Sequence, residues 1–107
     1  MSFWVYILRC ADDSYYTGHT DDLQRRITQH HAGEFPDCYT FYRRPLQLVF
    51  TQTLATRLEA LESERQIKGW SRKKKEALIR GDWDEVSRLA KSSSNKNKTT
   101  RSARTGT

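Results

Sequence analysis

The sequence predicts a small α/β fold of the α+β kind, in which helices flank a three-stranded antiparallel sheet within a single domain. Two segments rich in β-branched and aromatic residues lie on either side of a turn, which is typical of a hairpin. Segments with helical periodicity follow and surround one further apolar run. The length of 107 residues favours one domain with one modest core.

The predicted hairpin consists of residues 3–9 and 15–17. Residues 11–14 between them, Ala-Asp-Asp-Ser, have the composition of a turn. Gly18 ends the second strand. Because glycine has no side chain, another group can come close to the backbone at this position. A third strand is predicted over residues 46–51, and apolar residues on both of its faces indicate the central position in the sheet.

Thr20, Asp21 and Asp22 can act as an N-cap, and a first helix is predicted to follow them and to run to about Ala32. Leu23 and Ile27 are spaced to face the core, and Gly33 is a suitable residue to end the helix. A long loop with two prolines then covers residues 34–45.

Three more helices are expected after the third strand, over residues 55–69, 71–80 and 82–89. Their expected core-facing residues are Leu58, Leu61 and Ile67 in the first of these helices, and Trp83, Val86 and Leu89 in the last. After Lys91 the chain is dominated by Ser, Asn, Lys, Thr and Arg. We therefore expect a folded domain over residues 1–90 and a disordered basic tail over residues 91–107.

The composition favours a polyanionic partner. Lysine and arginine number 19 against 13 acidic residues, for a net charge of +6, which most often indicates nucleic acid but also fits a solvated basic surface. Cys10 and Cys38 lack metal-site spacing and are expected to be reduced thiols. No segment has the length and apolarity to span a bilayer, and the start lacks the pattern of a signal peptide, so we expect a cytoplasmic protein without membrane contact.

Two tyrosine motifs lie near the start of the chain, Val5-Tyr6-Ile7 and Tyr16-Thr17-Gly18. Arg26 follows the motif glycine by eight residues, and His30 and Glu64 lie further along. With these residues in this order, the segment from Val5 to about Leu89 resembles the GIY-YIG endonuclease family, in particular its small single-domain bacterial subgroup. Residues 16–30 are similar to the family's motif stretch, and residues 60–70 are similar to its acidic-helix segment.

The resemblance implies a divalent-metal-dependent hydrolysis of phosphodiester bonds, with Mg²⁺ or Mn²⁺ as the cofactor. It assigns the metal-ligating role to Glu64 and a catalytic role to Arg26, and it places His30 where relatives keep a histidine or tyrosine. Tyr6 and Tyr16 are the motif tyrosines; we favour Tyr16 as the base and Tyr6 as a positioning group. The chain departs from the family in having no asparagine between Glu64 and Asn95.

The residue types suit this chemistry. A carboxylate such as Glu64 is a natural ligand for a hard cation, although Glu64 can equally be a solvated helix residue paired with Lys68. Arg26 can hold a phosphate with its planar fork, and His30 shares its helix face, although a histidine there can also serve as a helix cap. Arg25 is expected to point roughly 100° away from Arg26. The tyrosines can also be ordinary core aromatics of a hairpin.

Additional contacts to the nucleic-acid backbone are expected from seven basic residues and one glycine. The alternative is that these residues form only a solvated surface. These residues are Gly18, His19, Arg25, Lys68, Arg72, Lys73, Lys74 and Lys75.

The leading functional hypothesis is an endonuclease acting on DNA, with RNA as an alternative, that selects a DNA structure in repair or recombination. Two other hypotheses stay open: a noncatalytic nucleic-acid-binding module of the same fold, and an accessory subunit whose protein partner provides the target. The joint presence of the tyrosines, Arg26, His30 and Glu64 favours the enzyme, because a carboxylate repels phosphate when no metal is bound.

Overall fold

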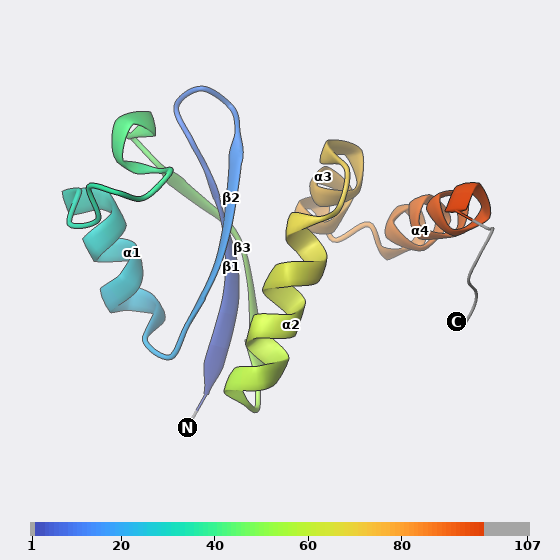
Figure 1. The fold of residues 1–107 in the computed structure, drawn as a ribbon, viewed down its shortest axis with the longest axis horizontal. Coiled ribbons are helices and arrows are strands. Elements are labelled where there is room, and N and C mark those ends of the chain that lie inside the picture. The colour runs from blue at the N-terminus through green and yellow to red at the C-terminus, as the bar shows by residue number, and fades with distance from the viewer. Residues whose placement is uncertain (1, 98–107) are drawn as a thin grey trace. The chain divides into compact units, whose positions relative to one another are not determined.

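The computed structural model describes residues 2–97. The elements in chain order are β1 (Phe3–Arg9), β2 (Tyr15–Thr20), α1 (Leu23–Ala32), the 3-10 turn η1 (Phe41–Arg43), β3 (Gln47–Leu54), α2 (Arg57–Lys68), α3 (Arg72–Arg80) and α4 (Trp83–Asn97) (Figure 1). Contacts divide the chain into a first unit that ends at Gly69 and a second that begins at Trp70. The expected single domain over residues 1–90 stays a prediction.

The three strands form one antiparallel sheet in the order β2-β1-β3. The predicted sheet and hairpin are confirmed, but the prediction that the third strand is central was wrong. β1 occupies the centre, and β3 is an edge strand on which Leu48 is 38% exposed. Both strands are apolar on two faces, so the pattern alone could not distinguish them. Only the pairing shows that β1 has a neighbour on each side.

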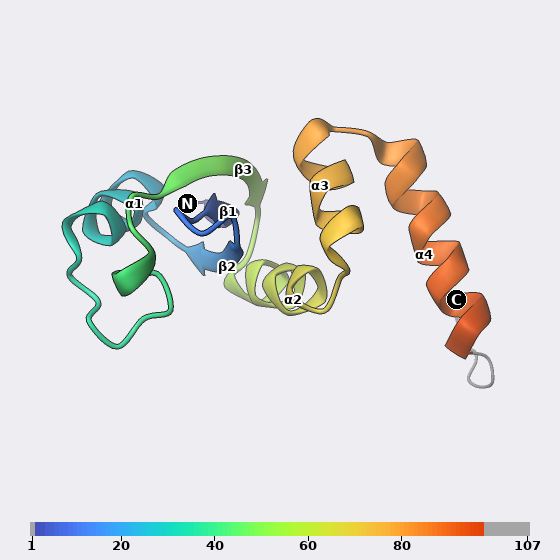
Figure 2. The same cartoon turned by 90° about the horizontal axis from the view of Figure 1, so that it is seen from above.

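The central strand is buried on both of its faces, since no residue from Val5 to Leu8 is exposed. Helices α1 and α2 lie on opposite faces of the sheet (Figures 1 and 2). Tyr6 and Leu8 belong to a core cluster against which Leu23 and Ile27 of α1 pack, as predicted. Alternation along a strand turns Val5 and Ile7 to the other face.

The ends of α1 agree with the sequence prediction. The Asp22 side chain accepts a hydrogen bond from the backbone N–H of Arg25 and so caps the N-terminus. At the C-terminus Gly33 has a left-handed backbone with φ of 72°, and its N–H bonds the carbonyls of Gln29 and His30. This conformation favours glycine, because a Cβ atom strains it.

Helix α2 begins with a capping box, in which Thr56 and Glu59 each accept a hydrogen bond from the other's backbone N–H. Its buried residues are Ala60 and Ile67. Glu64 lies between them on the same helical stripe, four residues after Ala60. Leu58 was predicted to face the core, but it is 63% exposed because it lies on another side of the first turn.

In the second unit α3 packs against α4, and α3 is capped at its start by the Ser71 side chain. Trp83 was predicted to anchor the last helix but is 58% exposed, whereas Val86 is buried as expected. Helix α4 continues to Asn97 and not only to Leu89 as predicted. No glycine or proline interrupts this stretch, and extending an existing helix adds one hydrogen bond per residue. Of the predicted tail, residues 98–107 lie outside the described residues.

Both cysteines are free thiols; Cys10 is buried and Cys38 is half-buried. Within residues 2–97, none of the helices combines the length and the apolarity that a membrane crossing requires.

Gly18 is required where β2 pairs with β1. It lies opposite Tyr6, and a Cβ atom on Gly18 would come within 2.5 Å of the Tyr6 hydroxyl oxygen and 3.2 Å of the Tyr16 ring. Gly18→Ala should therefore lower the free energy of unfolding by about 1–3 kcal/mol, the usual cost of overpacking. Urea titration measures this change.

Gly69→Ala is the matched control, because a Cβ atom there meets nothing closer than 3.6 Å. It should change stability by less than about 0.5 kcal/mol. Equal stability of the two variants would show that Tyr6 does not press against the Gly18 backbone.

Candidate active site

Two tyrosines of the hairpin lie side by side above the sheet. Tyr6 of β1 is fully buried, and its ring centre is 6.4 Å from that of the half-buried Tyr16 of β2. The two residues share a face because Tyr6 pairs with Gly18 and Leu8 pairs with Tyr16. The small Gly18 leaves the space that the Tyr6 hydroxyl occupies.

His30 of α1 connects this pair to the loop that follows the helix. Its Nε2 atom lies 2.9 Å from the Tyr6 hydroxyl, and its Nδ1 atom lies 3.1 Å from the Thr40 hydroxyl. Thr40 in turn donates to Cys38 Sγ at 3.4 Å. The single Thr40 proton is thereby used, so the Thr40 oxygen accepts from His30 Nδ1–H. His30 Nε2 is then the acceptor for the Tyr6 hydroxyl proton.

The ionisation of these groups follows from their burial. Burial raises the pKa of Tyr6 to about 12, although the charge and hydrogen bonding of Arg26 oppose the rise. Burial also raises the pKa of Tyr16, and the neighbouring Tyr6 adds to that rise. Burial lowers the pKa of His30 to about 4, assisted by the charges of Arg26 and His31. At neutral pH both tyrosines and His30 are therefore uncharged.

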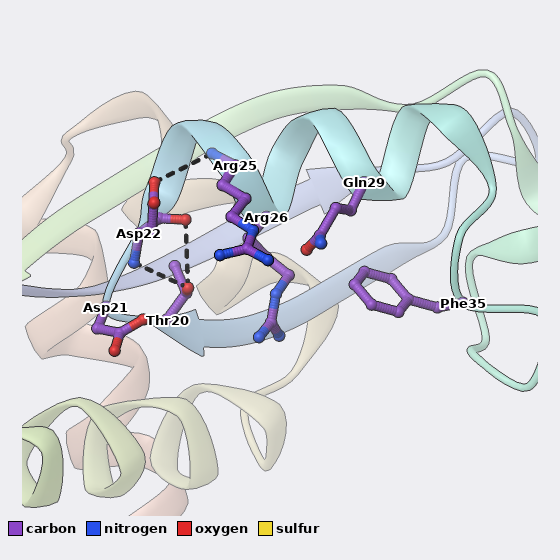
Figure 3. Close-up of a pocket in the computed structure, with 7 residues that line it drawn as sticks. All are labelled: Thr20, Asp21, Asp22, Arg25, Arg26, Gln29 and Phe35. Carbon is purple, nitrogen blue, oxygen red and sulfur yellow. Dashed lines mark hydrogen bonds between the residues drawn. The ribbon is translucent and has the colours of Figure 1, made fainter.

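Arg26 lies between this cluster and an open pocket of about 250 Å³. Its guanidinium is 5.4 Å from the Phe35 ring, which also packs edge-on against His30 at 5.1 Å. Arg25 was expected to point away from Arg26, but both arginines line the pocket (Figure 3). Long flexible side chains at the start of α1 can converge although their Cα atoms are rotated apart. The pocket residues are Thr20, Asp21, Asp22, Arg25, Arg26, Gln29 and Phe35.

Glu64 of α2 is held by two basic side chains. Its Oε1 atom is 2.5 Å from His19 Nδ1, and its Oε2 atom is 2.7 Å from Lys68 Nζ. Burial raises the pKa of Glu64, but the hydrogen bonds from His19 and Lys68 outweigh it and lower the pKa overall. The carboxylate is therefore ionised although its side chain is only 13% exposed.

The ion-paired residues Glu64 and Lys68 reach the tyrosines through Lys68, at the edge of the sheet. β2 is an edge strand, and Lys68 Nζ lies 5.9 Å from the centre of the Tyr16 ring. The charge of Glu64 contributes to the raised pKa values of both Tyr6 and Tyr16. Glu62, the rival carboxylate two residues earlier, is exposed. The structure thus turns Glu64, and not Glu62, toward the edge of the sheet that β2 forms.

The basic run of α3 belongs to the second unit and is not a uniform cationic stripe. Arg72 pairs with Glu76 at 3.1 Å, and the Lys74 ammonium lies 4.0 Å from the Trp70 ring centre. Burial lowers the pKa of Lys74 and of Lys75. Contacts of Arg72, Lys73, Lys74 and Lys75 with nucleic acid stay predictions.

Sequence reasoning missed the contribution of the loop over residues 34–45. Phe35, Cys38, Thr40 and Tyr39 all contact the cluster, and Tyr39 is stacked on Tyr16 with ring centres 6.5 Å apart. No periodicity marks such residues in a loop. The available signal was the concentration of aromatic residues in this segment.

The fold and this cluster define the class of the protein. A model of the GIY-YIG catalytic domain matches residues 2–77, which is most of the described chain. The chain therefore belongs to the GIY-YIG family, as the tyrosine motifs predicted.

Several of its relatives carry the name UPF0213. The chain is 43% identical over 76 residues to a UPF0213 protein of Bacillus pumilus, covering 71% of this chain and 76% of that one. It is 47% identical over 75 residues to the UPF0213 protein HQ_3675A of Haloquadratum walsbyi, covering 70% and 83%. The solution structure of the UPF0213 protein BH0048 of Bacillus halodurans matches with a TM-score of 0.50 at 40% identity, covering 84% and 98%.

The buried neutral His30 predicts a pH dependence of stability. An unfolded histidine titrates near pH 6.5, whereas His30 in the folded protein titrates near pH 4. Between these values the unfolded state binds more protons, so stability falls as pH falls through this window and is retained above it. The contribution of His30 to the loss between pH 7.5 and pH 5 should be about 2 kcal/mol, measured by urea titration at both pH values.

His30→Gln should remove this part of the pH slope, whereas His31→Gln, at the exposed neighbouring position, should keep it. A slope that is unchanged in His30→Gln would mean that His30 is already accessible to protons in the folded protein.

Proposed function

We propose that the protein is a metal-dependent endonuclease that hydrolyses phosphodiester bonds of DNA. The observation that carries this proposal is the ionised Glu64 carboxylate, which lies on the inward stripe of α2 and whose partner Lys68 reaches the Tyr16 ring. A helix position of this kind normally holds an apolar residue. A carboxylate that is only 13% exposed is costly there, so its role is better explained by binding a cation than by packing.

The residues fit a divalent cation of the Mg²⁺ type. Among residues 2–97 no three His, Cys, Asp or Glu side chains cluster as a cage for a metal. Mg²⁺ does not require such a cage, because it retains waters and takes one or two carboxylates together with substrate phosphates. Glu64 is the residue that would hold the ion. When bound, the ion would supply positive charge that stabilises the developing charge on the phosphate.

Arg26 is suited to bind the scissile phosphate. Its guanidinium lines the open pocket and at the same time interacts with Tyr6. A planar guanidinium matches two phosphate oxygens and stabilises negative charge where it develops. A phosphate on Arg26 would also offset the positive charge that lowers the pKa of His30, so His30 becomes a better proton acceptor once substrate is bound.

Tyr6 and His30 can then move a proton together. The Tyr6 hydroxyl donates to His30 Nε2 and accepts from Arg26, so its oxygen has one lone pair left for a proton of the attacking water. Tyr6 is fully buried, so this step requires Arg26 to turn toward the phosphate and admit the water. The Tyr6 proton passes to His30 Nε2. The proton on His30 Nδ1 remains there, hydrogen-bonded to the Thr40 oxygen. Tyr16 is instead hydrogen-bonded to the Cys38 sulfur, which is a weaker proton acceptor than an imidazole nitrogen. We therefore propose Tyr6 as the base, in place of the Tyr16 favoured by the sequence alone, and Tyr16 as a positioning group.

A noncatalytic nucleic-acid-binding module is the second candidate, and one observation favours it. Both Glu64 oxygens are already satisfied by His19 and Lys68, so the repulsion between the carboxylate and a phosphate is reduced without any metal. On this hypothesis the two basic residues substitute for the ion.

Glu64→Gln separates the two candidates. The variant keeps the size and hydrogen bonding of the side chain but loses the charge that holds a cation. On the enzyme hypothesis, cleavage of labelled DNA in Mg²⁺ or Mn²⁺ falls by at least about 100-fold. Binding of the same DNA in EDTA is retained or tightened, and the free energy of unfolding changes by less than about 1 kcal/mol.

Glu62→Gln is the control, because it removes the same charge from an exposed position of the same helix. It should cleave as the parent does. Equal cleavage by both variants would remove Glu64 from the mechanism, and absence of cleavage by the parent on every DNA and RNA form tested would favour the binding module.

A further inference from the structure

The loop over residues 34–45 continues the tyrosine cluster outward as a stack of planar groups. The Tyr39 ring is nearly parallel to that of Tyr16, at 16° and with a centre-to-centre distance of 6.5 Å. The Arg43 guanidinium lies 3.7 Å from the centre of the Tyr39 ring. The stack therefore leads from Tyr16, inside the candidate active site, to an arginine whose side chain is 37% exposed.

The Arg43 guanidinium is held over the Tyr39 ring by hydrogen bonds within the protein. Its Nη1 donates to the Tyr39 carbonyl at 2.8 Å, and its Nε donates to Asp12 Oδ2 at 3.2 Å. Its own carbonyl accepts a hydrogen bond from the Ala11 N–H at 2.8 Å. With two of its five N–H donors engaged in this way, the guanidinium is held in place and its flat face remains suited to stacking.

Tyr42 adds a second planar surface next to Arg43 in the chain. Its side chain is held edge-on against Phe41, with ring centres 4.7 Å apart, and yet the residue is 86% exposed. A large aromatic residue with this exposure contributes little to the core, so its ring is available to stack on a planar ligand.

We propose that Arg43 and Tyr42 form a stacking platform for unpaired nucleobases of a single strand whose backbone passes the candidate active site. This inference rests on the proposed function and names its substrate class: single-stranded nucleic acid, or an unpaired segment beside a duplex. Aromatic and guanidinium planes accept any base, whereas the bases of an intact duplex are already stacked on one another. The cationic Arg26 lies on the same side of the hairpin, close to Tyr6, where it can bind the phosphate of the same strand.

The test is binding to short oligonucleotides that contain one 2-aminopurine, whose fluorescence is quenched when the base stacks. The full-length protein is titrated in EDTA against an oligothymidylate, the matching oligouridylate and the DNA duplex of the same length. Binding should quench the base in the single strands and leave the duplex signal unchanged. The DNA and RNA arms show which sugar is preferred, and quenching in either supports the platform.

Two variants test the named residues. Arg43→Lys keeps the charge but loses the plane, and Tyr42→Ala removes an exposed ring that the core does not need. Each should weaken single-strand binding by about tenfold, because stacking of one base contributes roughly this much. Arg65→Lys, the same substitution at an exposed position of α2, should bind within about twofold of the parent.

Equal affinity for single strand and duplex, or parental binding by Tyr42→Ala and Arg43→Lys, would overturn the platform. Weaker single-strand binding by Arg43→Lys alone, together with a changed circular dichroism spectrum, would also count against the platform. That result would reflect altered folding of Arg43→Lys, and the parental affinity of Tyr42→Ala would show that Tyr42 does not stack. These results are independent of cleavage. Quenching without any cleavage in Mg²⁺ would refute the proposed function and support the platform. Equal cleavage of single strand and duplex without quenching would support the proposed function and refute the platform.

Discussion

The hydrogen bond between the Tyr6 hydroxyl and His30 Nε2 is the interaction on which the rest of the site depends. Tyr6 is on the central strand and fully buried, so its hydroxyl needs a partner inside the protein. Gly18 on β2 leaves room for that hydroxyl, and α1 supplies the imidazole that accepts from it. One buried polar contact therefore sets the position of the hairpin and the first helix together.

The same contact extends to the loop over residues 34–45. His30 uses its second nitrogen for Thr40, and Thr40 uses its proton for Cys38. Burial raises the pKa of Cys38, but hydrogen bonds from Thr40 and Tyr16 together with the charge of Lys68 outweigh it, so the pKa is lowered and the sulfur is a better acceptor. Every polar group along this path is satisfied, which is what a buried network requires. The exposed aromatic residues of the loop are thereby held on a rigid support.

The sequence predicted the hairpin, α1 and the existence of α2 because these elements depend on local patterns: alternation, caps and helical spacing. Of the core residues expected in α2, Ile67 is buried whereas Leu58 is exposed. The family resemblance grouped Tyr6, Tyr16 and His30 as site residues, and in the structure their rings lie together. The errors arose where a pattern had two solutions. Strands β1 and β3 are both apolar on two faces, and the exposed Trp83 could not be distinguished by type from a buried tryptophan.

The sequence also did not reveal hydrogen bonds between polar residues that are far apart along the chain. Thr40 reaches His30, and His19 reaches Glu64 across 45 residues, through tertiary packing that no short spacing records. His19, for which a phosphate contact or a solvated position was expected, is paired with the carboxylate of Glu64 in this structure. A contact of this kind depends on how the edge strand and the helix meet, and so it can be seen only in three dimensions.

The protonation of His30 tests this account most directly. The nitrogen chemical shifts of its ring, measured by NMR at neutral pH, report which ring atom carries the proton. We predict a neutral imidazole protonated on Nδ1, with Nε2 unprotonated and shifted when Tyr6→Phe removes the donated hydrogen bond. A proton on Nε2, a charged imidazolium, or shifts that are unchanged in Tyr6→Phe would contradict the proposed direction of proton transfer.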